Sequence, residues 1–242
     1  MGISSSHPRY QSLVWRQQIA EGVRRGLVHE TGMIAHGRGE AFDYLLGETT
    51  IPVAAEAERA AAYVLSRAHR PVISVNGNTA VLAGEACVRL AEVTGAALEV
   101  NLFHRTAERI EKIASWLEEC GGRDVLGREV EARIPGLEHD RARCSREGIY
   151  AADVVLVPLE DGDRCQALKN MGKTVLTIDL NPLSRTAQTA HITVVDNVVR
   201  AVPAIARHAE SEDFIVAWDN RRALQSCLDY LCRRLSSLYE SE

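Results

Sequence analysis

The stretch PVISVNGN, from Pro71 to Asn78, decides the fold that we expect for this chain. Pro71 to Val75 has the length and the apolar, β-branched character of a buried strand, and the polar turn after it opens a segment rich in Ala, Leu and Val. That segment reaches about Thr94 and predicts a helix. A strand followed directly by a long helix is the repeating unit of an α/β protein.

The alternation of strands and helices continues toward the C-terminus. Further strands are expected at Ala97–Leu102, Val154–Pro158, Thr174–Ile178 and Ile192–Val195. Helices are expected at Thr106–Glu119, Asp163–Met171, Asn197–Arg207 and, as a last amphipathic helix, Trp218–Leu238, with Pro203 kinking or shortening the third. Short apolar strands separated by helices predict an α/β fold: a Rossmann-like, largely parallel sheet with helices on both faces.

Residues 1–70 predict a helical N-terminal segment that precedes the sheet. Helices are expected at Pro8–Gly26, with Pro8 in the first turn, and at Ala54–Ala68, which is rich in Ala. Between them, the Gly-rich stretch Thr31–Glu40 leads into Ala41–Leu46, which reads as a short helix. With no internal repeat, we expect one Rossmann-like domain over 1–242, made of the helical segment over residues 1–70 and an α/β portion with a C-terminal helix over residues 71–242.

Composition and charge exclude several classes of protein. Of the 242 residues, 46% are hydrophobic and 25% charged, as in an ordinary globular protein. A net charge of −5 without a basic block argues against a nucleic-acid partner. The apolar runs have the length of strands, far from the roughly 20 residues that span a bilayer, and the N-terminus does not resemble a signal peptide. We therefore expect a cytoplasmic protein with no membrane partner.

The cysteines do not predict a metal site. The chain has 6 cysteines, at irregular intervals and without a C-x-x-C pair. Most of them lie in apolar helical patterns, where a free thiol behaves as a small buried hydrophobe. We expect them to fill the core.

The residues that follow each strand are the candidates for ligand binding, because ligands of doubly wound sheets bind beyond the carboxyl ends of the strands. Asp179 closes one strand, where a carboxylate can accept hydrogen bonds from ribose or simply cap a turn with Asn181. Arg185 and Thr186, on the same loop, suit phosphate oxygens. Asn197 begins a helix, and it either caps that helix or reads an adenine edge.

Neither of the two commonest nucleotide fingerprints, the G-x-x-x-x-G-K-[ST] loop and a G-x-G-x-x-G after a strand, is present. The segment His36–Glu40 superficially resembles a phosphate loop but follows no strand, so a plain turn is the alternative. Arg38 strengthens the functional interpretation, because a guanidinium between two glycines can reach a phosphate without steric obstruction. Glu160, Asp161 and Asp163 could hold Mg²⁺, or form a solvated loop in which Asp163 caps a helix.

Long stretches of the chain resemble the archaeal phosphopantothenate synthetases, also called 4-phosphopantoate:β-alanine ligases. The stretches that carry the resemblance are His7–Tyr10, Ser12–Leu13, Arg16, His36–Glu48, Ser74–Asn78, Glu99–Phe103, Ile134–Leu137, Ala152–Arg164 and Ile178–Gln188. Together they extend over nearly the whole chain, and strings of this length are more specific than a short motif.

The resemblance implies a homodimer that joins 4-phosphopantoate to β-alanine in coenzyme A biosynthesis, splitting ATP to AMP and diphosphate. The ATP contacts that it implies are Arg16, Arg38, Asp179, Leu180, Asn181, Arg185, Thr186, Asn197 and Val198. Several of these lie in the loops chosen above on physical grounds.

AMP and diphosphate as products fit an acyl-adenylate intermediate. Arg16, Arg38 and Arg185 would neutralise the phosphates, with Mg²⁺ assisting. The residues expected to take part in catalysis are Arg38, His36 and Asp161. Further cation candidates are Arg9, Arg105 and Arg109, although a solvated arginine on a helix face is the more common case. A second candidate for accepting the amine proton is His104, although a single His in a loop is more often a bystander than a base.

Two other functions remain open from the sequence. A nucleotide-sensing module without chemistry would need only the Asp179 and Asn197 loops. A Rossmann oxidoreductase is less well supported, since the Gly fingerprint is missing.

Overall fold

The protein is built around a parallel sheet. The computed structural model describes residues 4, 6–159 and 161–237. Within them, five strands form the sheet in the order β2-β1-β5-β6-β7, with bounds β1 Pro71–Val75, β2 Ala97–Val100, β5 Val154–Pro158, β6 Thr174–Ile178 and β7 Ile192–Val194. All neighbouring pairs are parallel; Ile73 of β1 lies opposite Leu98 on one side and Leu156 on the other. The predicted strands and the fold class are confirmed.

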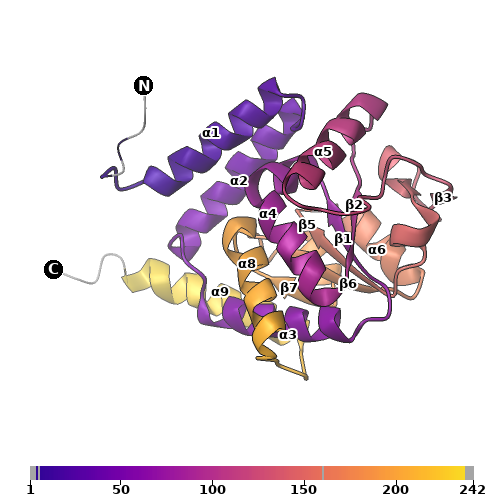
Figure 1. Ribbon diagram of the computed structural model, residues 1–242. Helices are drawn as coiled ribbons and strands as arrows, with labels where there is room; N and C mark the ends of the chain where they lie inside the picture. Colours follow the sequence, from indigo (N-terminus) through magenta and orange to yellow (C-terminus); the bar gives the residue numbers. More distant parts are fainter. Residues whose placement is uncertain (1–3, 5, 160, 238–242) are drawn as a thin grey trace.

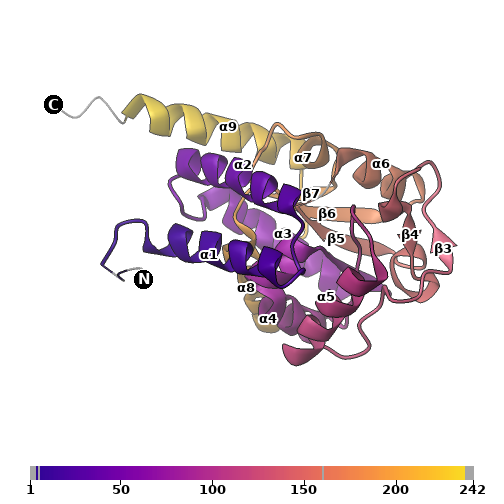
Figure 2. The ribbon, with the colours of Figure 1, turned by 90° about the horizontal axis from the view of Figure 1, so that it is seen from above.

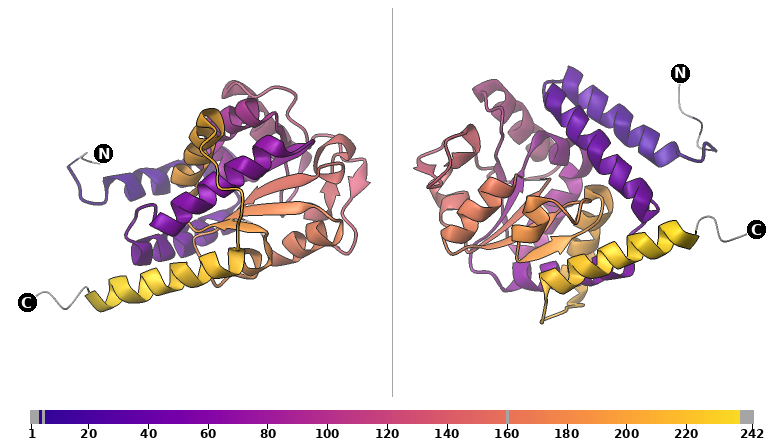
Figure 3. Two further views of the ribbon diagram at one scale, coloured as in Figure 1. Left: turned by 90° about the horizontal axis from the view of Figure 1, so that it is seen from below. Right: turned by 180° about the vertical axis from the view of Figure 1, so that it is seen from behind.

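Helices cover both faces of the sheet (Figures 1 and 3). One face packs against α3 Pro52–Arg67, α4 Gly77–Thr94, α5 Ala107–Glu119 and α8 Val198–Ser211. The opposite face packs against α6 Gly162–Asn170 and the irregular segment that holds the short hairpin of β3 Ala132–Arg133 and β4 Arg143–Cys144. The short helix α7 Arg185–Thr189 lies beside α6.

The chain reverses its direction across the sheet between β1 and β5. From β1 it moves outward to β2, and after the irregular segment it returns to β5 and proceeds through β6 to β7. Such a switch point opens a crevice at the carboxyl ends of the two central strands. Asn76, directly after β1, spans it: its Nδ2 donates to the carbonyl oxygens of Pro158 at 3.0 Å and Leu159 at 3.3 Å.

Three further helices form a layer beside the sheet: α1 Tyr10–Arg24, α2 Glu30–Leu46 and α9 Asn220–Ser237. Figure 2 shows α1, α2 and α9 running side by side, on the side of the molecule away from the β3–β4 hairpin. Buried Leu46 at the end of α2 packs in one cluster with Leu180 after β6 and Leu231 of α9. Helix α2 is thereby held over the Asp179 loop.

The plain turn considered for His36–Glu40 is wrong, because the whole Gly-rich stretch Thr31–Glu40 belongs to α2. The Nδ1 of His29 caps the helix by accepting from the backbone N–H of Thr31, and Gly47 ends it in the left-handed conformation with a φ of 93°. Capping and the burial of Leu46 outweigh the low helix propensity of the three glycines. Tertiary packing often overrides intrinsic helix propensity in this way.

Smaller differences concern element ends. Pro8 lies before α1, whose N-cap is Arg9, rather than in its first turn. Helix α8 is not shortened by Pro203 but continues to Ser211, since its apolar face is buried against α4. The second strand ends at Val100 instead of Leu102.

The cysteines are free thiols, and Cys87, Cys144, Cys165 and Cys227 are buried, which confirms their interpretation as core residues; Cys232 is exposed. Among the described residues, no helix combines the length and the apolar character that crossing a bilayer requires.

Candidate functional site

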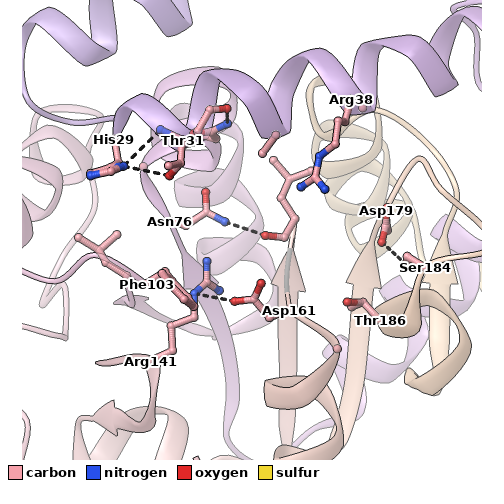
Figure 4. A pocket seen from close by; sticks show the side chains of 18 of the residues that line it. His29, Thr31, Arg38, Asn76, Phe103, Arg141, Asp161, Asp179, Ser184 and Thr186 are labelled. Atoms are coloured by element: carbon pink, nitrogen blue, oxygen red, sulfur yellow. Dashed lines mark hydrogen bonds and ion pairs between the residues drawn. The ribbon is translucent and has the colours of Figure 1, made fainter. Parts of the chain in front are cut away.

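A cavity of about 680 Å³ lies between α2 and the carboxyl ends of the strands. Its roof comes from one face of α2, and its floor from the loops after β1, β2, β5 and β6. In Figure 4, Asp179, Ser184 and Thr186 lie toward one end with Arg38 above them, His29 and Thr31 lie toward the other, and Asn76, Arg141 and Asp161 lie between. The switch-point crevice is therefore one elongated, polar cavity.

The loop after β6 forms the first end. Asp179 Oδ1 accepts from the backbone N–H of Asn181 at 2.9 Å, and its Oδ2 accepts from the hydroxyl of Ser184. Burial raises the pKa of Asp179, while Ser184, Asn181 and the nearby Arg38 oppose that rise. The turn-capping role considered for Asp179 and Asn181 is therefore real. Each carboxylate oxygen has a second lone pair, so this role leaves Asp179 able to accept from a ligand.

Arg38 projects from α2 over the Asp179 loop. It lines the cavity, its side chain is exposed, and it lies near enough to Asp179 to oppose the rise in that carboxyl's pKa. The next residue, Gly39, packs closely on the loop, since a Cβ there would lie 3.4 Å from Leu180 Cδ1. The absence of a side chain at Gly39 lets α2 approach the loop and brings the Arg38 guanidinium above it.

The acidic residues at the start of α6 are paired with arginines. Asp163 Oδ1 accepts from Arg185 Nη2 at 2.6 Å, and Asp161 Oδ2 lies 3.4 Å from Arg141 Nε. The predicted cap at Asp163 is wrong, because α6 begins at Gly162 and Asp161 holds the N-cap position. Glu160 lies outside the described residues. Among the described residues, no group of three or more His, Cys, Asp or Glu side chains is arranged to hold a metal ion.

Arg141 and Asp161 form an ion pair at the middle of the cavity. Arg141 is only 7% exposed, and the carbonyl oxygen of its own backbone accepts from Asn101 Nδ2 at 3.3 Å. A buried arginine held beside a carboxylate can bind an anionic group, while the carboxylate attracts an ammonium group. The middle of the cavity therefore offers both charges to a pair of reactants.

Five of the predicted binding residues other than Arg38 line this cavity, namely Asp179, Leu180, Asn181, Arg185 and Thr186. Arg16 does not: it is exposed and pairs with Glu40, its Nε lying 2.9 and 2.8 Å from the two carboxylate oxygens. His36 is also absent from the lining; it lies near Arg16 and Glu40, and burial lowers its pKa.

Asn197 and Val198 are buried and do not line the cavity. The amide of Asn197 is engaged within the chain, because Nδ2 donates to Asp43 Oδ2 at 2.9 Å and Oδ1 caps α8 by accepting from Val199. Of the further candidate cations, Arg109 lines the cavity, whereas Arg9 pairs with Glu40 and Arg105 donates to the carbonyl of Gly127.

The sequence is similar to those of proteins named as ligases over nearly its full length. The family model described as phosphopantothenate/pantothenate synthetase matches residues 53–234. A protein of Methanosarcina mazei named 4-phosphopantoate–β-alanine ligase is 49% identical over 245 residues, covering 98% of this chain and 96% of the relative. Proteins of the same name from Thermococcus kodakarensis and Methanospirillum hungatei are 49% and 53% identical, covering 99% and 87% of this chain and 96% and 86% of the relatives.

The chain belongs to the phosphopantothenate/pantothenate synthetase family.

In this member of the phosphopantothenate/pantothenate synthetase family, the cavity combines two regions of the chain. The loops of the floor fall within the matched residues 53–234, whereas α2, which carries Arg38, precedes them. Reasoning from strand ends found the floor, but it missed Arg141, which lies in the irregular segment, and His29, which precedes a helix that was not expected. The sequence signal for His29 was weak: it lies directly before Glu30–Leu46, a segment that is followed by Gly47, a residue type common at the C-terminal ends of helices.

Proposed function

We propose that the protein is an ATP-dependent ligase that condenses 4-phosphopantoate with β-alanine to 4-phosphopantothenate, releasing AMP and diphosphate, in coenzyme A biosynthesis. The observation that carries the proposal is the single elongated cavity at the switch point, whose two ends are both suited to anions and whose middle holds the Arg141–Asp161 pair. The names of the relatives supply the substrates.

ATP would bind at the end formed by the loop after β6. Arg38 and Arg185 would neutralise phosphates, Asp179 would accept from ribose hydroxyls, and Leu180, Asn181 and Thr186 would complete the walls; all of them line the cavity. Arg16, Asn197 and Val198 stay predictions of the family resemblance, because the cavity of this chain does not include them.

The proposed chemistry needs a leaving group on a carboxylate. An oxygen of the 4-phosphopantoate carboxylate attacks the α-phosphorus of ATP and diphosphate leaves, which forms an acyl-adenylate. The deprotonated amine of β-alanine then attacks the acyl carbon, the amide bond forms, and AMP leaves. Alignment of three reactants in one cavity supplies much of the acceleration. Arg38 stabilises charge on the phosphates.

The ammonium group of β-alanine must lose a proton before it attacks. Asp161 lines the cavity beside Arg141, and His36 does not line it. We therefore favour Asp161 over His36 as the acceptor of this proton. His104, the other candidate, lies at the far end, away from the Asp179 loop.

Mg²⁺ would accompany ATP rather than occupy a site of the protein. The described carboxylates of the acidic loop, Asp161 and Asp163, are both paired with arginines. Mg²⁺ usually binds through substrate phosphates and one or two carboxylates. The described residues do not form a ready cage for the ion.

The proposal includes a cytoplasmic homodimer. Helix α2 presents four large exposed hydrophobic side chains, Met33, Ile34, Tyr44 and Leu45. Tyr44 follows Met33 by about three helical turns, and Leu45 follows Ile34 by the same distance. The four side chains therefore lie on one face of the helix. A second copy of the chain is the partner we propose for it.

An assay of AMP release tests the enzymatic function. We expect AMP only when ATP, 4-phosphopantoate and β-alanine are all present, and Arg38→Ala should lower kcat/KM about 100-fold. Arg67→Ala, an exposed arginine at the end of α3, is the matched control and should keep full activity. Binding of ATP without substrate-dependent AMP would instead identify a nucleotide-sensing module.

A further inference from the structure

The end of the cavity opposite the Asp179 loop is formed by the starts of three helices. His29, Thr31 and Gly32 come from the start of α2, Gly77 and Asn78 from the start of α4, and Phe103 and His104 from the loop before α5. These helices have 17, 18 and 13 residues. The start of a helix carries a partial positive charge and unpaired N–H groups, so three converging starts favour an anion. We call this region the triple-helix end.

Close contacts hold the three starts together. Asn78 Nδ2 donates to the carbonyl of Gly32 at 2.8 Å, which ties α4 to α2. A Cβ at Gly77 would lie 2.2 Å from the carbonyl oxygen of Leu27, so a side chain there would push the loop before α2 away from α4. The triple-helix end is therefore a fixed arrangement of the fold.

Arg109 adds a cation that has no carboxylate partner among the described residues. Its Nη1 donates to the carbonyl of His104 at 2.5 Å and its Nη2 to that of Leu27 at 3.1 Å. Its Nε has no hydrogen-bond partner among the described residues, and burial lowers its pKa. Neighbouring carbonyls thus orient this half-buried guanidinium, but no described carboxylate neutralises it. Such a group favours a bound anion.

Two stacked imidazoles complete the triple-helix end. The rings of His29 and His104 lie 3.8 Å apart at an angle of 21°. Because His29 Nδ1 accepts from the backbone N–H of Thr31, its proton is on Nε2, which can donate to a ligand. Burial, then His104 and Arg109, lower the pKa of His29, whereas Glu30 opposes this. His29 is thus a neutral donor in positive surroundings.

We propose that the triple-helix end binds the phosphate group of 4-phosphopantoate, with Arg109, His29 and His104 as its recognition residues. A phosphomonoester carries close to two negative charges and accepts several hydrogen bonds, which matches one guanidinium, two imidazoles and three helix starts. The name of the substrate rests on the proposed function, while the geometry independently supports the class, a phosphomonoester. The carboxylate of the substrate then lies toward Arg141, between the two ends.

The competing occupant is the terminal phosphate of ATP, and selective binding measurements separate the two. The test variant is His29→Asn with His104→Ala, since Asn preserves the cap of α2 and His104 is exposed. Arg109→Gln removes the cation. His69→Ala, an exposed histidine beyond the other end of β1, is the matched control.

Isothermal titration with 4-phosphopantoate and, separately, with ATP gives the readout, together with the KM of each. In the double variant and in Arg109→Gln we expect Kd and KM for 4-phosphopantoate to rise about tenfold or more, with those for ATP within about twofold of the wild type. The control should match the wild type for both ligands. Wild-type protein should bind 4-phosphopantoate far more tightly than pantoate, which lacks the phosphate.

Two results for these variants would overturn the inference. In the first, ATP binding is weakened while 4-phosphopantoate binding is unchanged; in the second, the binding of neither ligand changes. Wild-type protein that binds 4-phosphopantoate at this end but releases no AMP contradicts the proposed function alone. Circular dichroism verifies folding, and if the double variant does not fold, His104→Ala alone carries the same comparison.

Discussion

Glu58 of α3 is a buried carboxyl group in an unfavourable setting. It is 2% exposed, and its Oε1 has no hydrogen-bond partner among the described residues. Burial, and then the carboxylate of Asp196, raise its pKa from 4.5 to about 8, although Arg207 and Arg200 oppose the shift. The folded state thus holds this proton to a higher pH than the unfolded state. The stability linked to it is complete below about pH 4.5 and is lost as pH rises toward 8.

Replacing Glu58 with Gln should remove this loss, because the amide mimics the protonated acid at every pH. We expect Glu58→Gln to raise the free energy of unfolding by roughly 2–4 kcal/mol at pH 8 and to change it little at pH 4.5. Urea unfolding at both pH values measures the difference. A variant that is equally stabilised or destabilised at the two pH values would contradict the raised pKa.

At the scale of elements, α2 is fixed near both ends. Its first turn is tied to α4 through Asn78, and Asp43 near its C-terminal end pairs with Arg200 of α8, whose Nη2 lies 2.5 Å from Asp43 Oδ1. The same Nη2 lies 2.5 Å from Asp196 Oδ1. Asp43 and Asp196 are 2% and 0% exposed, so one arginine pairs with two buried carboxylates. This network holds Arg38 over the Asp179 loop.

Arg200→Met should leave both carboxylates buried without their cation. We expect it to lower the free energy of unfolding by about 3 kcal/mol or more, since breaking a buried pair strands a charge. Arg59→Met is the matched control, because its pair with Asp213 is 35% and 45% exposed and should cost less than about 1 kcal/mol. Denaturant titration compares the two; equal losses would show that the Arg200 network adds nothing.

Some elements could be predicted from the sequence and others could not, and the difference has physical reasons. Strands such as Val154–Pro158 were predictable because full burial in a parallel sheet demands an unbroken apolar run. Asp179 was predictable because it comes directly after a strand, and Thr186 because it follows in the same connection, although the structure places it in α7. Helix α2 was not predictable, because its stability comes from tertiary contacts of Leu46 and Asp43 rather than from propensity. Arg141 reaches the cavity from an irregular segment that no periodicity describes.

At the scale of the whole molecule, the exposed apolar face of α2 makes the proposed homodimer testable. Ile34, which is 67% exposed, should lie in the interface, and Ile34→Glu should give a monomer in sedimentation velocity. Val216→Glu changes an apolar residue that is 70% exposed and lies before α9, and this control should remain dimeric. A monomeric wild type, or a dimer unaffected by Ile34→Glu, would rule out this face.

The position of α2 before residue 53 has a consequence for how such enzymes can be engineered. The roof over the cavity and its floor come from separate stretches of chain, which meet in the apolar cluster of Leu46 and Leu180 and through the hydrogen bonds of Asn78 and Arg200. Residues 1–52 from a relative could therefore be grafted onto this sheet as one cassette, provided that the apolar cluster around Leu46 and the partners of Asn78 and Arg200 are kept. Such chimeras would vary the groups above the reactants while the loops beneath them stay constant.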